Sequence, residues 1–357
     1  MKVIIDILTP KQIMFFPRLA ERLTKRGHRV WLTSRKYREV SQLLELKGIK
    51  ATVVGEHGGK ELKNKLKASS QRIQELIPLF ERIDPDATVS FSSPEMARTS
   101  YGLGVPHICV NDSPHAVAVA KLTLPLSHKL LTPKMIPVEE WTKFGIAAGD
   151  VVHYNAIDPW VWLKDFKPDR SILDELGLNI TMPIITIRPP EAFASYLLAH
   201  HSQNFSAINI IDSLLNFRED IQVVAIPRYY EQIMELKKVF KERITICESV
   251  IDGPSLLSYT DIFLGMGGTM SLEAVLLGIP TFNYYPGETL ILDTLIEKGL
   301  LEKESDPARL IDKISKMLND LEGEKARRRE SVERLVEFYE DPIDIISMEI
   351  ERTSGGR

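Results

Sequence analysis

The sequence of 357 residues is poor in cysteine, in long apolar runs and in charge of one sign. Its two cysteines, Cys109 and Cys247, are far apart inside apolar runs, so we expect two buried thiols and neither a disulfide framework nor a cysteine zinc site. No apolar stretch approaches the roughly 18 residues of a membrane-spanning helix. With 45 Lys and Arg against 49 Asp and Glu, the net charge is −4, which argues against a nucleic-acid-binding protein that relies on overall positive charge.

The composition is that of an ordinary globular protein. Hydrophobic residues make up 44% of the chain and charged residues 26%, which is enough apolar material for a sizeable core. At roughly 150 residues per domain, the length predicts two domains. The chain opens on the strand-like run KVIIDIL and not on the long apolar segment of a signal peptide, so we expect a cytoplasmic location.

Short β-branched runs alternate with segments of helical period throughout the first half. This alternation predicts βαβ units around a parallel sheet buried on both faces. Two of the expected helices, 12–26 and 36–47, end at Gly27 and Gly48, which supply left-handed caps. The five expected strands are residues 3–8, 29–33, 51–54, 87–91 and 107–110.

The alternation restarts after residue 182 and predicts a second domain of the same kind. The expected strands there are residues 184–187, 222–226, 244–247, 261–264 and 281–285. The expected helices are 205–217, 230–240, a short one from Pro254, and 269–277. The fold class is therefore α/β, with two Rossmann-like, doubly wound domains.

Irregular sequence between about residues 138 and 182 predicts the linker. We expect an N-terminal domain over 1–165, a linker over 166–182 and a C-terminal domain over 183–335. Three helical segments follow residue 306; the middle one carries KARRR at 325–329, for which a solvated helix face is expected and contact with an anionic surface is the alternative. The last segment, within 336–357, has an apolar face and is expected to pack back on the N-terminal domain.

The sharpest local signal is DIFLGMGGTMSLEAVLLGIPTFNYYP at 261–286, which predicts a strand, a glycine-rich turn, a helix and a second strand. Gly267 and Gly268 allow a tight turn and close approach to a ligand, while the N–H groups of Thr269 and Met270 open the helix and can bind a phosphate. Glu273 follows one turn later, where its carboxylate can accept hydrogen bonds from ribose hydroxyls. A plain strand-to-helix turn with a solvent-facing glutamate is the alternative.

This segment resembles the C-terminal, nucleotide-sugar-binding half of GT-B enzymes, which include the peptidoglycan GlcNAc transferase and the non-hydrolysing UDP-GlcNAc 2-epimerase. The shared features are Gly267-Gly268, Glu273 and the G-x-P exit at 278–280. Over the whole chain, SSPEMAR at 92–98, VNDSPHAVAVAKLTLP at 110–125 and FKPD at 166–169 resemble a GT-B-shaped family catalogued as a domain of unknown function. The resemblance implies two domains that face each other across a cleft.

By the same resemblance, the loop 248–252, with Val250 at its centre, corresponds to backbone that holds the nucleotide base. Arg188 and Arg228 each end an expected strand of the second domain, so either guanidinium can reach a diphosphate. The alternative for both arginines is that they satisfy a neighbouring carboxylate or helix end.

The N-terminal domain is expected to carry the acceptor and any general base, on the post-strand loops 9–12, 92–95 and 111–115. Asp112 and His115 combine a carboxylate and an imidazole after a buried strand, which suits deprotonation of a hydroxyl. Because Ser113 and Pro114 follow, Asp112 also fits a helix N-cap. Glu95, after Pro94, is a third catalytic candidate, and a simple interaction with the helix dipole explains it equally well.

These features favour an inverting glycosyltransferase that moves a sugar from a nucleotide-diphosphate donor, expected to be a UDP-sugar, to an acceptor hydroxyl. The donor is a substrate, and neither a metal nor another cofactor is expected. One alternative is a UDP-GlcNAc 2-epimerase-like enzyme. Its T-x-H-R-x-E stretch would fall on 186–191, with Arg188 in place of the histidine, and the opening strand lacks its G-T-R-P-E. The other alternative is a nucleotide-sugar-binding protein without turnover.

The acceptor is not identified by the sequence. A lipid-linked acceptor is compatible with LTLPLSHKLL at 122–131, near Lys121 and Lys129, although such a segment is more often core. Peripheral contact with a membrane is therefore the alternative to a purely cytoplasmic location, and a nucleic-acid partner is not expected.

Overall fold

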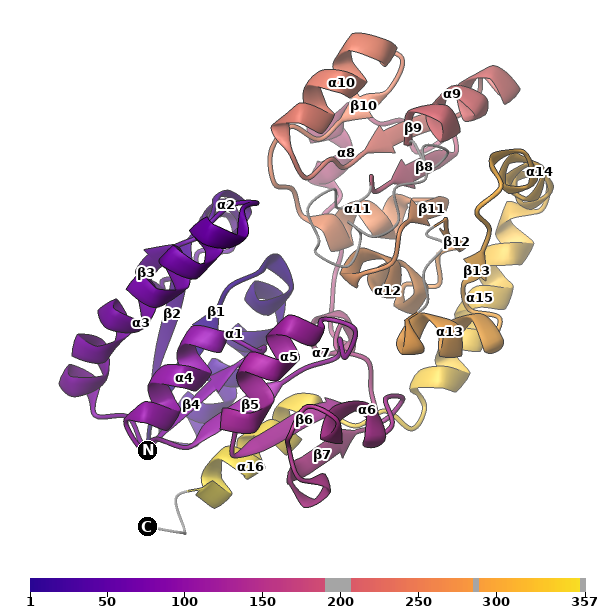
Figure 1. Cartoon of the computed structure of the whole chain (residues 1–357). Helices are drawn as coiled ribbons and strands as arrows, with labels where there is room; N and C mark the ends of the chain where they lie inside the picture. The colour runs from indigo at the N-terminus through magenta and orange to yellow at the C-terminus, as the bar shows by residue number, and fades with distance from the viewer. Residues whose placement is uncertain (190–206, 285–288, 354–357) are drawn as a thin grey trace. The chain divides into compact units, whose positions relative to one another are not determined.

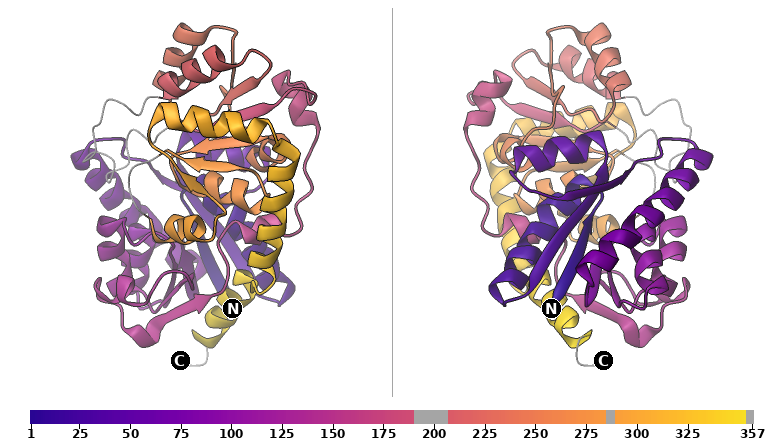
Figure 2. Two further views of the ribbon diagram at one scale, coloured as in Figure 1. Left: turned by 90° about the vertical axis from the view of Figure 1, so that its right-hand side faces the viewer. Right: turned by 90° about the vertical axis from the view of Figure 1, so that its left-hand side faces the viewer.

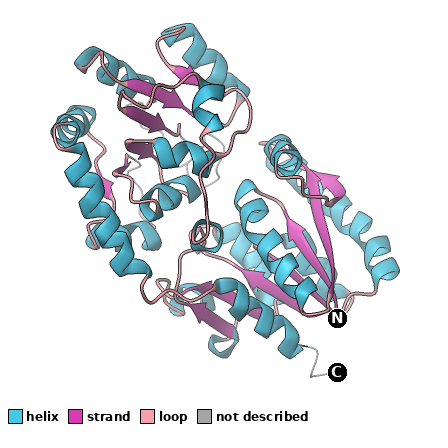
Figure 3. Cartoon of the chain, turned by 180° about the vertical axis from the view of Figure 1, so that it is seen from behind, coloured by secondary structure: helices cyan, strands magenta, loops and turns pink. Residues whose placement is uncertain are grey.

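The computed structural model describes residues 1–189, 207–284 and 289–353, which divide into two compact units. Unit 1 comprises Met1–Trp162 together with Tyr339–Arg357, and unit 2 comprises Leu163–Phe338. Each unit is a parallel β-sheet flanked by helices (Figures 1 and 3). The expected fold class is thus confirmed for both halves of the chain.

Unit 1 contains a seven-stranded sheet in the order β3-β2-β1-β4-β5-β6-β7, and every neighbouring pair is parallel. Its strands are β1 (Lys2–Ile7), β2 (Arg29–Lys36), β3 (Thr52–Glu56), β4 (Ala87–Ser90), β5 (His107–Val110), β6 (Lys129–Pro133) and β7 (Val151–Tyr154). Its helices are α1 (Pro10–Lys25), α2 (Arg38–Leu46), α3 (Leu62–Ile83), α4 (Pro94–Gly102), α5 (Val117–Thr123), α6 (Glu139–Thr142) and α16 (Pro342–Thr353), with α7 (Trp160–Leu163) at the junction with unit 2.

Local sequence explains the first βαβ unit. Five of the six residues of β1 are buried, as expected of a central strand that is covered on both faces. Helix α1 begins with Pro10, whose missing N–H falls where a helix has no acceptor for it. It ends before Gly27, which adopts φ +83°. Strand β2 extends to Lys36, so the expected helix start at residue 36 is wrong; α2 begins at Arg38.

Two strands of this sheet, β6 and β7, were not among the expected strands, and β7 lies in the segment that was expected to be irregular. The segment LTLPLSHKLL runs through the end of α5 and into β6, where Leu130 and Leu131 are fully buried, and Lys129 pairs with Asp150 at 2.7 Å. Strand β7 is an edge strand, and three of its four residues are only half-buried. An edge strand needs no continuous apolar run, which is why the pattern of its sequence did not reveal it.

Unit 2 contains a six-stranded parallel sheet in the order β10-β9-β8-β11-β12-β13. Its strands are β8 (Ile184–Ile187), β9 (Gln222–Ala225), β10 (Thr245–Ile246), β11 (Ile262–Gly265), β12 (Thr281–Asn283) and β13 (Glu302–Lys303). Its helices are α8 (Ser171–Leu176), α9 (Ala207–Phe217), α10 (Tyr230–Phe240), α11 (Gly253–Tyr259), α12 (Thr269–Leu276), α13 (Leu290–Glu297), α14 (Pro307–Leu318) and α15 (Leu321–Val336). The two-residue edge strand β13 was not expected. Residues 205, 206 and 285 of the expected elements lie outside the described part.

The C-terminal helix α16 belongs to unit 1 and packs against α1 (Figure 2). Its apolar face buries Ile343, Ile346 and Ile350. Beside this face, Arg22 of α1 forms ion pairs with Asp341 and Asp344. Apolar burial and flanking ion pairs therefore fix the end of the described chain to the first helix.

The basic run on α15 is engaged within unit 2. Arg328 is buried and pairs with Glu302 at 2.9 Å, and Lys325 pairs with Asp261. Arg327 pairs with Asp320 at 3.0 Å and with Glu324 at 2.6 Å. Part of the run is thus a buried structural contact, which differs from the fully solvated face that was expected.

Candidate functional site

Each sheet presents the carboxyl ends of all its strands at one edge, because its strands are parallel. The strand order reverses between β1 and β4 in unit 1 and between β8 and β11 in unit 2. Doubly wound sheets bind ligands outside the carboxyl ends at such reversals. The loops after these strands are therefore the first place to look for a site in each unit.

In unit 2, the glycine-rich turn follows β11 directly. Gly267 and Gly268 have φ of +82° and +85°, a region that residues with side chains rarely occupy. A Cβ on Gly267 would lie 2.9 Å from Leu292 Cδ1, whereas a Cβ on Gly268 would meet no atom within 4 Å in the described part of the chain. Gly268 is exposed and is the N-cap of α12. The turn therefore presents the start of this helix to open space.

Helix α12 places Thr269 and Met270 in its first turn, where main-chain N–H groups have no acceptor within the helix. Glu273 lies on the same helix with a relative exposure of 4%, so the expectation of a solvent-facing glutamate does not hold. The hydroxyl of Ser271 is buried and has no hydrogen-bond partner among the described residues. The helix start thus combines open main-chain donors with buried polar side chains, an arrangement suited to an anion.

The loop after β10 approaches the same helix. Val250 is half-buried in this loop, and Asp252 accepts a hydrogen bond from the Ser255 hydroxyl at 2.9 Å. A Cβ on Gly253 would lie 3.6 Å from Met270 Cε. Ile251 and Met270 pack on one apolar cluster with Cys247 and Leu256. The structure therefore brings the loop of Val250 beside the first turn of α12.

The two arginines end neighbouring strands. Arg188 follows β8, and its Nη1 donates to the carbonyl oxygens of Ile226 and Pro227 at 2.8 and 3.4 Å. Arg228 follows β9, and its main-chain N–H donates to Gln232 Oε1 at 2.8 Å. Both arginines lie at the same edge as the glycine-rich turn because β9, β8 and β11 are adjacent and parallel. Two main-chain carbonyls that follow β9 thus accept hydrogen bonds from Arg188.

In unit 1, Asp112 belongs to a buried charged cluster. Lys11 Nζ lies 2.6 Å from Asp112 Oδ2 and 2.5 Å from Asp158 Oδ2, and Tyr154 donates its hydroxyl proton to Asp158 Oδ1 at 2.5 Å. The side chain of Asp158 is fully buried, whereas that of Asp112 is 16% exposed. The N-cap expectation for Asp112 is wrong: α5 starts at Val117 after Ala116, and Asp112 binds Lys11 instead.

The cluster separates the pKa values of its two carboxyl groups. Burial would raise the pKa of Asp112, but the charge and hydrogen bond of Lys11 outweigh burial and hold the pKa below its usual range. Burial raises the pKa of Asp158 to about 6; Asp112 adds to this rise and Lys11 opposes it. Two neighbouring carboxyl groups with separated pKa values are a common arrangement for acid–base chemistry.

His115 lies three residues after Asp112 on the exposed side of the same loop. Desolvation lowers the pKa of its imidazole, and the negative charge of Asp112 partly offsets this effect. The ring is therefore mainly neutral near pH 7, the state in which an imidazole can accept a proton. The structure thus keeps Asp112 and His115 together as a pair of candidate bases.

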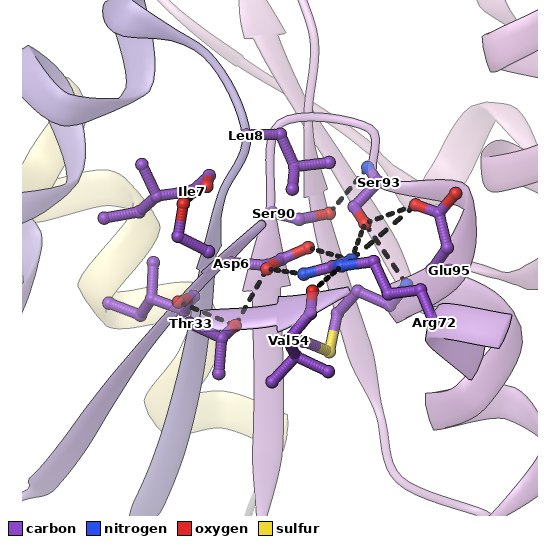
Figure 4. A network of polar contacts seen from close by, with 12 residues as sticks. Asp6, Ile7, Leu8, Thr33, Val54, Arg72, Ser90, Ser93 and Glu95 are labelled. Carbon is purple, nitrogen blue, oxygen red and sulfur yellow. Dashed lines mark hydrogen bonds and ion pairs between the residues drawn. The ribbon is translucent and has the colours of Figure 1, made fainter. Parts of the chain in front are cut away.

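Glu95 lies in a separate network of polar contacts (Figure 4). Arg72 reaches Asp6 through two bonds of 2.6 and 3.0 Å, and its Nη1 lies 3.7 Å from Glu95 Oε2. Burial would raise the pKa of Asp6, but the charge and hydrogen bonds of Arg72 outweigh it and hold the pKa down. Ser93 caps α4 by accepting from the Met96 N–H at 3.2 Å. Glu95 is therefore engaged with Arg72, and the structure does not bring it into the cluster of Asp112.

Some of these residues left a signal in the sequence and some did not. Asp6 interrupts an apolar strand, and Lys11 lies in the expected post-strand loop 9–12, although the structure places it in the first turn of α1. Arg72 lies in the middle of a charged helix, and Asp158 and Tyr154 lie in the segment that was assigned to irregular structure or linker. Their roles come from tertiary pairing, which no local pattern records.

The described residues contain neither a metal-binding cluster nor a membrane-spanning helix. Within the described ranges, no cluster of three or more His, Cys, Asp or Glu side chains is arranged to hold a metal ion. Over the same ranges, no helix combines the length and the apolar character needed to cross a membrane.

Solved structures with the same fold include nucleotide-sugar enzymes. A putative UDP-N-acetylglucosamine 2-epimerase from Listeria monocytogenes aligns with a TM-score of 0.74 and 16% identity, covering 97% of this chain and 94% of that one. UDP-GlcNAc 2-epimerase from Neisseria meningitidis, bound to UDP-GlcNAc, aligns with a TM-score of 0.73 and 16% identity and covers all of both chains. Anabaena HepE in complex with UDP-glucose gives 0.67 and 12%, also over all of both chains. These similarities confirm the GT-B-like fold.

The sequence itself has a full-length relative. An uncharacterized protein of Methanocaldococcus jannaschii is 30% identical over 353 residues, which cover 96% of this chain and 95% of the relative. Residues 1–351 match the model of a family described as "Protein of unknown function (DUF354)". The match spans both parallel sheets and both candidate edges described above, so the chain belongs to the DUF354 family.

Proposed function

We propose that unit 2 binds the diphosphate of a nucleotide-sugar, with UDP as the nucleotide, and that the protein transfers the sugar to an acceptor hydroxyl. The observation that carries this proposal is the turn at Gly267 and Gly268, where the N-cap of α12 is exposed and a Cβ on Gly268 would meet no atom of the described residues within 4 Å. Main-chain N–H groups at a helix start bind phosphate without a metal. The similar structures that hold UDP-sugars support the choice of ligand.

The proposed donor contacts follow from the same edge. The N–H groups of Gly268, Thr269 and Met270 take the diphosphate, assisted by the positive end of the α12 dipole. Arg188 and Arg228 supply positive charge beside the turn, and Glu273 accepts hydrogen bonds from the ribose. The main-chain groups of the loop at Val250 hold the base.

Unit 1 is proposed to supply the base. Asp112 is the partly exposed member of the carboxyl pair and takes the proton of the acceptor hydroxyl, or passes it to His115. The acceptor oxygen then forms a bond to the anomeric carbon as the bond from that carbon to the diphosphate oxygen breaks. The nucleoside diphosphate leaves with the electron pair, and the amides at the α12 start stabilise its charge. Lys11 and Asp158 hold Asp112 in place.

The test combines a binding screen with a turnover assay. A thermal-shift screen of nucleoside diphosphates and their sugars should show a rise in melting temperature with UDP and at least one UDP-sugar. Release of UDP from that sugar donor, in the presence of candidate acceptors, is then compared between wild type and the double variant D112N/H115Q. We expect the variant to bind the donor with unchanged affinity and to lose turnover. Unchanged turnover would refute the base assignment, and failure of every nucleotide to stabilise the protein would refute the proposal.

Epimerisation is the second candidate function. It is supported by the similarity to the epimerase structures from Listeria monocytogenes and Neisseria meningitidis, which align with TM-scores of 0.74 and 0.73. An NMR spectrum of UDP-GlcNAc incubated with the protein separates the two reactions. Inversion at C2 without an acceptor indicates the epimerase, whereas acceptor-dependent release of UDP indicates the transferase.

A further inference from the structure

A second set of charged groups lies at the carboxyl edge of the sheet in unit 1. Arg35 is the penultimate residue of β2, and His57 directly follows β3. The two strands are parallel neighbours, and Lys36 pairs with Glu56, so both side chains leave the sheet at the same edge. Lys65 of α3 lies close enough to influence His57 electrostatically.

One N–H group of the Arg35 guanidinium is buried without an acceptor in the described part of the chain. Its Nε is buried and has no hydrogen-bond partner among the described residues. The nearby carboxylates serve Arg72 instead: Asp6 lies 2.6 Å and Glu95 lies 3.7 Å from nitrogen atoms of Arg72. Desolvation lowers the pKa of Arg35 most; the charges of Glu95 and Asp6 oppose this effect, and the charge of Arg72 adds to it. A buried guanidinium donor with no acceptor is costly, which is a reason to expect that a ligand supplies the acceptor.

The loop that carries His57 is fixed in place rather than loosely attached. A Cβ on Gly55 would lie 2.9 Å from Arg72 Cγ, and a Cβ on Gly58 would lie 2.5 Å from the Lys65 backbone. The His57 main-chain N–H donates to the carbonyl of Lys36 at 3.0 Å, and its ring stacks on Tyr37 with centroids 4.7 Å apart. The glycines allow the loop to pack this closely against α3.

The His57 ring is oriented as a donor. Its Nδ1 accepts from the Gly59 N–H at 3.1 Å, so in the neutral ring the proton is on Nε2. Desolvation lowers the pKa of His57 most, and the positive charges of Arg35 and Lys65 lower it further, to about 4. Neutral imidazole and positive side chains together favour an anion and disfavour a cation.

We propose that Arg35, His57 and Lys65 form an anion-binding subsite in unit 1 that receives the carboxylate or phosphate group of the acceptor. A guanidinium is suited to either group, because its parallel N–H donors match two oxygens. That the bound molecule is the acceptor rests on the proposed function, whereas binding of an anion at this subsite does not. The subsite would select acceptors that carry a negative group in addition to the reacting hydroxyl.

The test is an NMR titration of the full chain with two probes, inorganic phosphate and acetate. The Arg35 Nε–H signal, assigned by its loss in Arg35→Met, should move downfield and saturate as the anion is added, and the ring signals of His57 should move with it. A response to phosphate alone, to acetate alone or to both supports the subsite and tells which group it prefers. No response of either signal to either probe would overturn the proposal.

Arg35→Met and Arg29→Met form a matched pair. Arg29 is exposed at the opposite end of the same strand. Read from the His57 ring, affinity for the responding anion should fall about 10- to 100-fold in Arg35→Met and stay unchanged in Arg29→Met. An undiminished response in folded Arg35→Met would contradict the proposal; if that variant does not fold, the wild-type titration decides. UDP binding is measured in parallel. Anion binding without UDP binding would support the subsite and refute the proposed donor site in unit 2. UDP binding without anion binding would support the donor site and refute the subsite.

Discussion

The two sheets are both parallel and both reverse their strand order, but different chemical groups lie at their carboxyl edges. In unit 1 the edge holds charged side chains paired with one another, in the Lys11–Asp112–Asp158 cluster and the Asp6–Arg72 network. In unit 2 it holds a glycine turn that leaves main-chain amides open at the start of α12. The parallel sheet thus determines where a site can form, and the loops determine which groups it contains. These groups are titratable side chains in unit 1 and main-chain donors in unit 2.

The largest effect is expected from breaking the buried pair that is peculiar to unit 1. Arg72→Leu leaves Asp6 charged and buried without the guanidinium that pairs with it, so the free energy of unfolding should fall by about 3–5 kcal/mol. Urea denaturation monitored by circular dichroism measures the loss. Arg327→Ala is the control, since Arg327 pairs only at an exposed surface and its loss should leave stability unchanged. A small effect of Arg72→Leu would mean that the edge of unit 1 does not depend on its ion pairs.

The next effect sharpens the role of the turn in unit 2. Gly268→Ala and Gly299→Ala both force a side chain into positive φ, +85° and +68°, at places where no atom of a described residue lies within 4 Å of the new Cβ. Both should lower the free energy of unfolding by about 1–3 kcal/mol. Only Gly268→Ala should also weaken UDP binding, measured by calorimetry, because Gly299 lies after α13 and away from the turn. Equal UDP affinity in the two variants would contradict a role of Gly268 in UDP binding.

A similar change in affinity is expected at the ribose contact. Glu273→Ala should weaken UDP binding by about 1–3 kcal/mol if two hydrogen bonds to ribose hydroxyls are lost. Titration calorimetry with UDP and with 2′-deoxy-UDP measures this loss, and the variant should no longer distinguish the two ligands. Glu297→Ala, at an exposed position at the end of α13, is the control. A variant that still prefers UDP would remove Glu273 from the ribose site.

The smallest effect concerns pH and unit 1. The pKa of Asp158 is raised to about 6, so between about pH 4 and pH 6 the folded chain holds a proton that the unfolded chain has lost. The stability that this proton contributes is present below about pH 4 and is lost as the pH rises through 6. Asp158→Asn should therefore show a flatter profile of unfolding free energy over this window, measured by denaturation at several pH values. Parallel profiles for the variant and wild type would contradict the raised pKa.

The sequence predicted the central strands of both sheets because those strands are apolar on both faces. It also predicted the turn at Gly267 and Gly268, since a strand, glycines and a helix start are adjacent in the chain. It did not predict β7, an edge strand with half-buried residues, or the partners Asp158 and Arg72, which lie 46 residues from Asp112 and 66 residues from Asp6. The geometry at Gly268 is local, whereas a buried ion pair joins distant segments and depends on their packing.

The proposed donor site depends most on the main-chain amides at the start of α12, which are proposed to bind the diphosphate. Amide hydrogen exchange of the full chain with and without UDP tests it directly. We predict slower exchange at Gly268, Thr269 and Met270 when UDP is bound, with no change at Gly299. Unchanged exchange over 268–270 under conditions where UDP is bound would contradict the account.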